Sequence, residues 1–251
     1  MTLLSIITIN YNNAEGLRKT IDSVRMQKFT DYEHIIVDGG STDGSVDVIK
    51  EALSDADYVK HVSWWCSEND SGLYNAMNKG IRHARGEWVY MLNSGDALVK
   101  NVLEQLSPEL KTHCNQIVYG AVDCYNENGY LWTQCKNSKD IDTGMFPHQG
   151  FFSPRIFHEK YGFYDENFKI LADWDYVLRL RENNCSFYHT PMIIADYDFS
   201  GISSQMTPLY KAEIKLIHAR YNIKPSTNKI KKFIKLFIPP FIILLYRRII
   251  K

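Results

Sequence analysis

The chain lacks the cysteine patterns of a zinc site or a disulfide framework. It holds five cysteines among 251 residues, an odd number that is widely scattered. They form no CxxC pair and no Cys/His spacing typical of zinc. We therefore expect free thiols in a reducing cytoplasm. The five are Cys66, Cys114, Cys124, Cys135 and Cys185.

The sequence pattern also indicates no targeting segment and no membrane-spanning segment. The opening MTLLSIITINYNN has no positively charged start and no small-residue cleavage site, so we expect no signal peptide. The main body has no apolar run near the roughly 20 residues that cross a bilayer. It also has no internal repeat and no low-complexity linker. These absences predict one domain, residues 1–223, followed by a tail.

Acidic residues are absent from that tail. Residues 224–251 carry eight Lys/Arg and no Asp or Glu, which leaves 21 basic and 29 acidic side chains in residues 1–223. A nucleic-acid binder should carry its basic residues on the folded face, so an acidic body argues against one. The apolar run at residues 236–246 is short and contains Pro239-Pro240. The tail therefore predicts peripheral binding to an anionic membrane surface. Packing on the domain, or in a seam with a partner chain, is the alternative.

The residues that are present indicate a folded α/β protein. The chain has 16 Tyr, 12 Phe and 5 Trp, with 45% hydrophobic and 23% charged residues. Apolar runs alternate with helical spacings over about the first 95 residues, which favours a parallel sheet with both faces covered. We expect strands at 3–10, 34–37, 58–66 and 87–92, and helices that include 17–24, begin near 45, and span 72–84.

The second half is less regular. A hairpin is predicted from residues 117–124 and 130–134 around the turn at 126–129. We expect helices at 173–183 and 208–221. Two short strands are expected at 186–189 and 192–195.

Polar clusters follow the first four predicted strands. They are residues 10–12, Asp38, residues 68–70 and residues 93–96. Open α/β sheets bind ligands at the carboxyl ends of their strands. Neither GxGxxG nor the Walker pattern GxxxxGK[ST] is present, so phosphates bound here would need another partner, usually a divalent metal. Any single cluster is also consistent with a plain helix cap.

Several motifs resemble family 2 glycosyltransferases of the GT-A fold. The match begins with SIITINYN at 5–12 and IIVDGGSTDG at 35–44. It covers about residues 3–205 and is closest to the bacterial branch that builds lipopolysaccharide, capsule or exopolysaccharide. The other segments are ENDSGLYNAMNKG (68–80), GEWVYMLNSGD (86–96), HQGFF (148–152), GFYDE (162–166), ADWDYVLR (172–179) and GIS (201–203).

The resemblance implies a Rossmann-like, mostly parallel central sheet flanked by helices. The donor half would be about 1–100 and the acceptor half about 101–223. Such enzymes move a sugar, typically with inversion, from a nucleotide-diphosphate donor, here expected to be a UDP-sugar, to a glycan or lipid-linked oligosaccharide. By position, Asn10 and Tyr11 would contact base and ribose, Asp38 the nucleobase, and Asp70 and Asn78 the nucleotide site.

The resemblance also assigns the metal ligand and the catalytic base. Asn93-Ser-Gly-Asp96 stands at the DXD metal motif, so Asp96 would bind Mg²⁺ or Mn²⁺ and Asn93 would touch ribose. Asp173 stands at the catalytic base, which takes the proton of the acceptor hydroxyl. Asp175 is expected to face away from Asp173 as a first-turn acid of the helix. The chain departs from the family at Gly39, Gly95 and Ala172, where acids are usual.

Two other functions stay open at this point. A sugar nucleotidyltransferase would need a GxGTRL-like loop after the first strand, and residues 10–16 lack it. A non-catalytic, membrane-associated nucleotide-sugar-binding module is consistent with the three lost acids. Turn or cap roles for Asp38, Asp96 and Asp173 remain the structural alternatives. His148 fits the acceptor side of the cleft or a buried polar position equally well.

Overall fold

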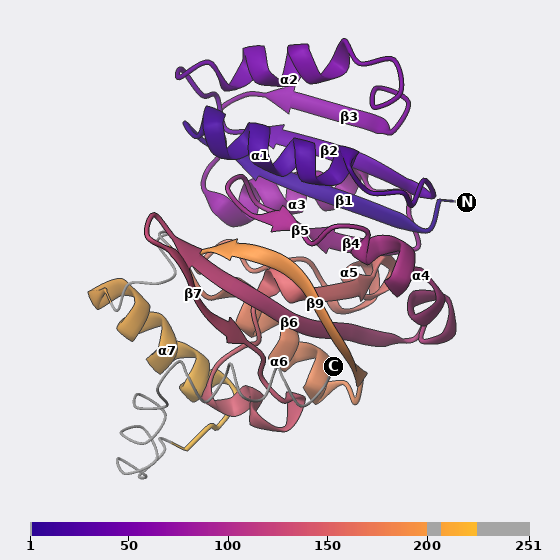
Figure 1. The fold of residues 1–251 in the computed structure, drawn as a ribbon. Helices are drawn as coiled ribbons and strands as arrows, with labels where there is room; N and C mark the ends of the chain where they lie inside the picture. The colour runs from indigo at the N-terminus through magenta and orange to yellow at the C-terminus, as the bar shows by residue number, and fades with distance from the viewer. Residues whose placement is uncertain (1, 200–206, 225–251) are drawn as a thin grey trace.

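The computed structural model describes residues 2–199 and 207–224, and within them nine strands form one sheet (Figure 1). Eight strands follow one path in the order β3-β2-β1-β4-β8-β6-β9-β5, and β7 pairs with β6. The strands are β1 (Leu4–Asn10), β2 (Tyr32–Asp38), β3 (Val62–Ser67), β4 (Trp88–Met91), β5 (Ala97–Leu98), β6 (Gln116–Asn126), β7 (Gly129–Gln134), β8 (Phe151–Pro154) and β9 (Ser186–Asp198).

Seven α-helices are described alongside the sheet within the same residue ranges. They are α1 (Ala14–Arg25), α2 (Ser45–Leu53), α3 (Leu73–His83), α4 (Val102–Thr112), α5 (Arg155–Tyr161), α6 (Ala172–Glu182) and α7 (Pro208–Arg220). Two short 3-10 helices span Ser138–Thr143 and His148–Gly150. No helix in the part of the chain that the structure describes is long and apolar enough to cross a bilayer. The predicted tail lies outside the described residues, apart from Lys224.

The first half of the sheet is parallel, as predicted. Strands β3, β2, β1 and β4 run in one direction, and β1 pairs in register with β2 so that Asn10 lies opposite Asp38. The chain starts at β1, moves outward to β2 and β3, then crosses to β4 on the other side of β1. That reversal is a topological switch point, where open α/β sheets bind ligands.

The second half makes the sheet mixed. Strand β8 pairs antiparallel with both β4 and β6, while β6 and β9 run parallel. These directions make β9 parallel to β4, so the two strands end at the same edge of the sheet. The last residues of β9 therefore lie beside the turn that follows β4.

Two of the predicted strand boundaries are wrong. Residues 58–61 form a turn, and β3 begins at Val62. The two short strands expected at 186–189 and 192–195 are one strand of 13 residues, β9. Its register against β6 shifts near Pro191, and such an irregularity accommodates a residue that has no backbone N–H.

Apolar side chains cover both faces of the sheet. Alternate strand residues point to opposite faces, so Ile7 and Val37 pack with α3 and α6, and Ile6 and Ile36 pack with α1 and α2. On α1, Leu17, Ile21 and Val24 form the buried stripe that their spacing predicts. The result is three layers, with helices on either side of the sheet.

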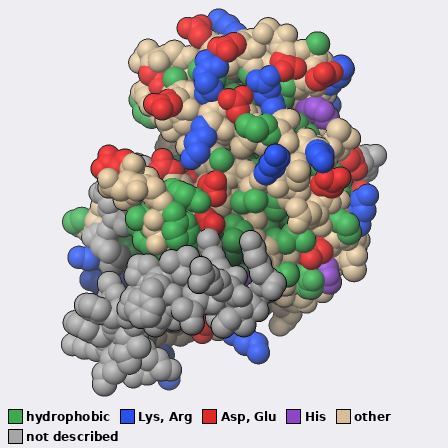
Figure 2. Space-filling model, viewed as in Figure 1, with side chains coloured by type: hydrophobic (Ala, Val, Ile, Leu, Met, Phe, Trp, Pro, Cys, Tyr) green, Lys and Arg blue, Asp and Glu red, His purple; other side chains and the backbone are tan. Residues whose placement is uncertain are grey.

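The described surface carries no large field of one sign on the face seen in Figure 2. There, Lys and Arg are interspersed with Asp and Glu over α1 and α2. Arg18 pairs with Glu51 at 2.7 Å, and Arg25 pairs with Asp22 and Asp55. Pairs this exposed contribute little to stability, and the partners neutralise each other's charge.

Candidate active site at the carboxyl edge of the sheet

Side chains from three neighbouring strand ends form one bonded row. Asn10, Asp38 and Ser67 end β1, β2 and β3, and the pairing register sets them side by side. Asn10 Nδ2 donates to Asp38 Oδ1 at 2.7 Å, and Ser67 Oγ donates to Asp38 Oδ2 at 2.6 Å. The predicted gathering of polar residues at this edge therefore includes Asn10 and Asp38.

Asp38 is fully buried, and both oxygens of its carboxylate accept hydrogen bonds. Besides the bonds from Asn10 and Ser67, it accepts from the Ser41 hydroxyl at 2.6 Å and the Ser41 N–H at 2.9 Å. Burial raises the pKa of the Asp38 carboxyl, but these hydrogen bonds outweigh burial and hold the pKa below its usual range. Four donors match the capacity of a carboxylate. A nucleobase contact would therefore have to replace one of these bonds.

Two neighbouring groups remain available to a ligand. Asn10 Oδ1 is buried, and none of the described residues donates to it. Tyr11, the next residue, is 68% exposed. An unsatisfied buried acceptor costs stability unless a ligand or water donates to it. These two side chains are where a base and ribose are expected to bind.

Asp70 occupies the space left by the missing acid at Gly39. A Cβ at Gly39 would lie 2.8 Å from Asp70 Oδ2 and 3.2 Å from Tyr11 Cδ2. The glycine thus lets a carboxylate from the loop after β3 approach the end of β2. The other oxygen of Asp70 accepts from the Gly72 N–H at 2.8 Å. The structure therefore places Asp70 beside Tyr11, and a role of Asp70 in a nucleotide site stays a prediction.

Helix α1 holds the turn at residues 93–96. Thr20 Oγ1 donates to the Asp96 carbonyl oxygen at 2.6 Å and accepts from the Gly95 N–H at 3.0 Å. Lys19 Nζ donates to the Gly95 carbonyl oxygen at 2.7 Å. The turn is thus fixed to the first helix, and Lys19 brings a positive charge to it.

Asp96 points into the protein. It is 3% exposed, and its two oxygens accept from the Asp198 N–H at 2.9 Å and from Gln149 Nε2 at 3.0 Å. Burial raises the pKa of the Asp96 carboxyl to about 7, against the effect of these two bonds. A buried carboxyl with such a pKa binds its proton more readily than an ordinary carboxyl does.

A second carboxylate lies at the lost position of the metal motif. A Cβ at Gly95 would lie 3.3 Å from Asp198 Oδ2, so the last residue of β9 reaches the place where the family usually has an acid. Within the described residues, no three His, Cys, Asp or Glu side chains are grouped to hold a metal ion. Mg²⁺ typically takes one or two carboxylates together with substrate phosphates. Asp96 and Asp198 offer two carboxylates for that smaller share, and Asp96 would have to exchange one of its hydrogen bonds for the metal.

Asn78 is used by the fold. It is 1% exposed, its Nδ2 donates to the Tyr164 carbonyl oxygen and to Glu166, and its Oδ1 accepts from the Tyr164 N–H at 3.0 Å. Both ends of the amide therefore bind the loop before α6. These contacts identify a cross-link between α3 and that loop, and they leave no free amide group for a nucleotide.

Asp173 lies in the first turn of α6 and is partly accessible. Its side chain is 18% exposed, and its Oδ1 accepts from the Trp174 N–H at 2.8 Å. The Tyr74 hydroxyl of α3 lies 3.2 Å from the same oxygen. Burial raises the pKa of the Asp173 carboxyl to about 6. At pH 7 such a group is mostly ionised but has a higher proton affinity than an ordinary carboxylate, which suits a general base.

His148 joins Asp173 to the turn after β4. Its Nε2 lies 3.0 Å from Asn93 Nδ2, and its Nδ1 lies 3.7 Å from Asp173 Oδ2. The neighbouring Gln149 holds Asp96. One short 3-10 helix thus contacts the predicted ribose, metal and base residues together.

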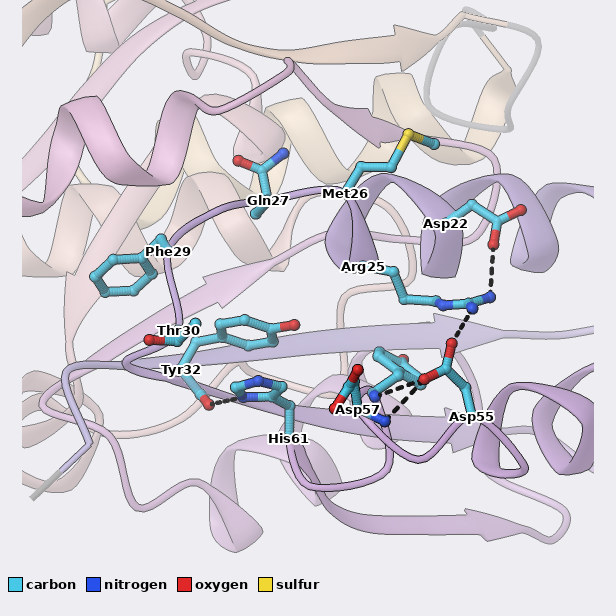
Figure 3. Close-up of a pocket in the computed structure, with 11 residues that line it drawn as sticks. Asp22, Arg25, Met26, Gln27, Phe29, Thr30, Tyr32, Asp55, Asp57 and His61 are labelled. Atoms are coloured by element: carbon cyan, nitrogen blue, oxygen red, sulfur yellow. Dashed lines mark hydrogen bonds and ion pairs between the residues drawn. The ribbon is translucent and has the colours of Figure 1, made fainter.

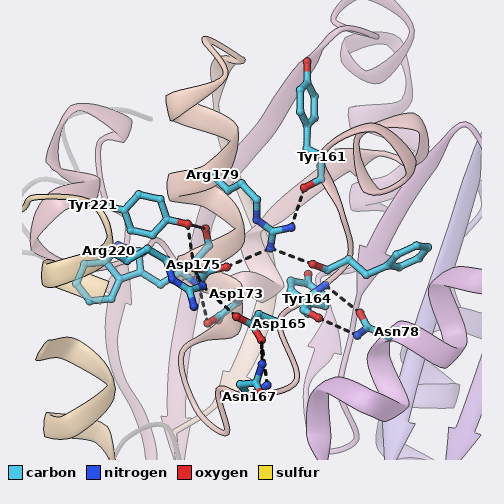
Figure 4. A network of polar contacts seen from close by, with 12 residues as sticks. Asn78, Tyr161, Tyr164, Asp165, Asn167, Asp173, Asp175, Arg179, Arg220 and Tyr221 are labelled. Atoms are coloured by element: carbon cyan, nitrogen blue, oxygen red, sulfur yellow. Dashed lines mark hydrogen bonds and ion pairs between the residues drawn. The ribbon is translucent and has the colours of Figure 1, made fainter. Parts of the chain in front are cut away.

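The position of Asp173 also depends on α7. Glu213, which is 3% exposed, accepts from the N–H groups of Lys169, Ile170 and Leu171, directly before α6. Asp175 faces away from Asp173, as predicted, and accepts from Arg179, Arg220 and Tyr221 (Figure 4). These contacts fix α6 against α7.

A cavity of about 510 Å³ lies at the opposite edge of the sheet (Figure 3). Its lining includes Tyr32, which begins β2, and His61, which precedes β3; the two rings stack with centroids 4.3 Å apart. Arg25 in its wall is paired with Asp22 and Asp55. None of the predicted site residues lines this cavity.

The sequence did not single out four side chains at this edge. They are Lys19, Tyr74, Gln149 and Asp198. Gln149 lies inside the HQGFF segment that carries the resemblance, so the motif itself pointed there. Tyr74 lies inside ENDSGLYNAMNKG, another of these segments. Lys19 and Asp198 come from separate parts of the chain, and only the fold places them near residues 93–96.

Comparison with known proteins agrees with this geometry. A sequence model described as Glycosyl transferase family 2 matches residues 5–184. An uncharacterised glycosyltransferase of Mycobacterium tuberculosis is 31% identical over 216 residues, which cover 82% of this chain and 78% of the relative.

Solved structures share the fold at low sequence identity. S. aureus TarS 1–349 in complex with UDP-GlcNAc gives a TM-score of 0.69 at 18% identity, covering 89% of this chain and 68% of that one. The chain spans 43% of a longer TarS chain. The mannosyltransferase PcManGT from Pyrobaculum calidifontis, in complex with GDP-Man and Mn²⁺, gives 0.62 at 16% identity, with 89% and 65% coverage. At such identities the likeness concerns the fold, and the predicted GT-A arrangement is confirmed.

Proposed function

The chain belongs to glycosyl transferase family 2, and we propose that it transfers a sugar from a UDP-sugar to a hydroxyl of a glycan acceptor with inversion. The observation that carries this proposal is the placement of Asp173. It brings a partly exposed carboxyl with a pKa of about 6 to the edge where the nucleotide-site residues end their strands. A hydroxyl becomes a competent nucleophile when such a carboxylate takes its proton as the new bond forms.

The donor would bind along the carboxyl edge. Asn10 offers a buried acceptor atom, Tyr11 an exposed ring and Asp70 a carboxylate, all next to Gly39. A carboxylate or amide oxygen accepts from a base N–H, which favours uracil over cytosine. Support for a nucleotide-sugar donor also comes from TarS, which was solved with UDP-GlcNAc.

A divalent cation, Mg²⁺ or Mn²⁺, is part of the proposal. Asp96 and Asp198 would hold it together with the donor diphosphate, and it would neutralise charge on the leaving nucleotide. PcManGT, solved with GDP-Man and Mn²⁺, is the related case. Lys19 adds a fixed positive charge at the same turn.

The acceptor is proposed to be lipid-linked and reached from the cytoplasmic membrane face, in cell-surface polysaccharide synthesis. Helix α7 supports this placement. Its outer side exposes Leu209 (47%) and Leu216 (60%), seven residues apart and therefore on one face. Lys211 and Lys215 are exposed on another side of the same helix. Exposed leucines and lysines are the two kinds of side chain that interfacial helices use on an anionic leaflet.

The test is a donor screen with a matched pair of variants. The wild-type chain is incubated with UDP-glucose, UDP-galactose, UDP-GlcNAc and GDP-mannose, each with Mn²⁺ or EDTA, and nucleotide release is measured. We expect metal-dependent release from a UDP-sugar. Asp173→Asn should reduce release by about 10²–10⁴-fold while UDP still binds. Glu182→Gln, an exposed acid at the other end of the same helix, should retain release.

The same screen separates the rival function. A non-catalytic nucleotide-sugar-binding module would bind UDP in calorimetry and release nothing from any donor. Equal release by wild type and Asp173→Asn would remove Asp173 from the mechanism. Full activity in EDTA would show that the reaction needs no divalent cation.

A further inference from the structure

His148 lies between the two halves of the proposed active site. Its Nε2 is 3.0 Å from Asn93 Nδ2, at the turn after β4, and its Nδ1 is 3.7 Å from Asp173 Oδ2, at the start of α6. The side chains of His148 and Asp173 are 16% and 18% exposed. Both side chains are therefore mostly buried but partly accessible.

The contact with Asn93 determines which ring nitrogen carries the proton. An amide N–H can only donate, so Nε2 must accept and must be unprotonated. A neutral imidazole then carries its proton on Nδ1, the nitrogen that faces Asp173. Burial lowers the pKa of His148 to about 4, so the ring is neutral near pH 7.

We propose that His148 is a positioning residue for Asp173, and that it couples the base to the donor-binding turn through Asn93. This inference rests on the proposed function. The Trp174 N–H and the Tyr74 hydroxyl lie at Oδ1 of Asp173, and the His148 Nδ1–H faces Oδ2. Oδ1 of Asp173 is thus bonded in the structure, whereas His148 faces Oδ2 at a distance longer than a hydrogen bond. The proposal requires this 3.7 Å separation to shorten when substrates bind, as catalytic hydrogen bonds commonly do.

Asn93 supplies the link to the donor. Its Nδ2 is used by His148, and its Oδ1 is buried with no donor among the described residues. A donor hydroxyl bound to Oδ1 would lock the amide in the orientation that keeps Nε2 of His148 unprotonated. Donor binding would therefore fix the tautomer that directs Nδ1–H to the base.

Two substitutions of His148 separate this role from simple packing. His148→Gln keeps an amide oxygen for Asn93 and an amide N–H for Asp173, whereas His148→Leu keeps comparable bulk and supplies neither. On whichever donor the wild type uses, Leu should lower kcat about 10- to 100-fold with KM for the donor nearly unchanged. Gln should recover most of kcat. His34→Gln is the matched control, because His34 is also buried with both ring nitrogens bonded, to Thr8 and Tyr58.

Nitrogen NMR of ¹⁵N-histidine-labelled protein tests the tautomer without turnover. The chain has eight histidines, and the signals that disappear in His148→Gln belong to His148. We expect a neutral ring protonated on Nδ1 at pH 7, and a shift toward mixed tautomers in Asn93→Leu while the His34 signals stay unchanged. An Nε2–H tautomer in the wild type would overturn the inference, as would equal kcat in the Gln and Leu variants. If the wild type uses no donor, only the proposed function is refuted. The NMR result would still decide whether His148 has the proposed tautomer.

Discussion

Asp173 sets the pH at which the proposed reaction can run. Burial raises the pKa of its carboxyl to about 6, and the groups facing it are Tyr74 from α3, His148, and Tyr210 and Glu213 from α7. Since the base must be ionised, kcat should rise with pH through about 6 and fall about tenfold for each pH unit below it. A pH–rate profile of nucleotide release measures this. A rate that stays flat from pH 5 to 8 would contradict it.

The pKa of Asp96 predicts that the stability of the folded chain depends on pH. Its pKa in the folded chain is about 7, above the ordinary 3.8, so the folded state binds this proton more tightly than the unfolded state does. The unfolding free energy from this group is therefore fully present below about pH 4 and declines as pH rises to about 7. Asp96→Asn should raise the melting temperature at pH 8 in EDTA and change it little at pH 4.5.

Added Mn²⁺ and a donor analogue provide the control for that variant. Mn²⁺ with UDP should stabilise the wild type at pH 8 because ligand binding favours the folded state. The same additions should stabilise Asp96→Asn much less. Equal stabilisation of both proteins would mean that Asp96 does not hold the metal.

At the scale of elements, Glu213 makes α7 part of the active site. Three backbone N–H groups before α6 depend on its carboxylate. Glu213→Leu should therefore lower the unfolding free energy by about 1–3 kcal/mol or more, because it leaves these donors without a partner. It should also lower kcat, since the loop leads directly into Asp173. Chemical denaturation and nucleotide release measure the two effects, and Glu104→Gln, an exposed acid on α4, is the control.

The elements that the sequence predicted are those with a long periodic signal. β1 and β2 were found from continuous apolar runs at 3–10 and 34–37, and α1 from Leu17, Ile21 and Val24 at helical spacing. Strand β8 was missed because its four residues, Phe151–Pro154, are too few to show a periodic pattern. Strand β5 has two residues. Helix α5 has seven residues, and α4 contains Pro108, which obscured its pattern.

The candidate site was predictable only where it is local in sequence. Asp38, Asp96 and Asp173 stand inside motifs and could be named in advance. The approach of Asp70 to Gly39 and of Asp198 to Gly95 depends on pairing between distant segments. No single-sequence pattern encodes that pairing. Asn78 shows another effect of the fold, because the side chain at this motif position is bonded to Tyr164 and Glu166, which the motif alone did not indicate.

At the scale of the whole molecule, the proposed membrane contact has two parts, the tail and α7. Removing residues 224–251 should strongly reduce flotation with anionic vesicles and spare nucleotide release. Each lysine or arginine near an anionic leaflet contributes about 1 kcal/mol, which salt screens. High salt should therefore weaken flotation of the full chain without abolishing it. Equal flotation of both forms would place the tail in a protein–protein seam.

The outer face of α7 can be tested separately. Leu209→Gln combined with Leu216→Gln should further lower the flotation of the full chain, because about 1.5–3 kcal/mol is gained by burying each leucine. Ile156→Gln, an equally exposed apolar residue on α5, is the control and should float as the wild type does. Vesicle flotation on neutral and on anionic lipid distinguishes the apolar part from the charged part.

The hydrogen bonds between α7 and the residues before α6 have a consequence for synthesis on the ribosome. Chains grow from the amino end at about 5–20 residues per second, and early segments fold first. Strands β1 to β4 can pair while the rest is still being made, so a nascent chain could hold a nucleotide sugar early. Glu213 emerges after Asp173 and supplies the last contacts that fix its loop. Translation order therefore delays the final positioning of Asp173 until α7 has emerged.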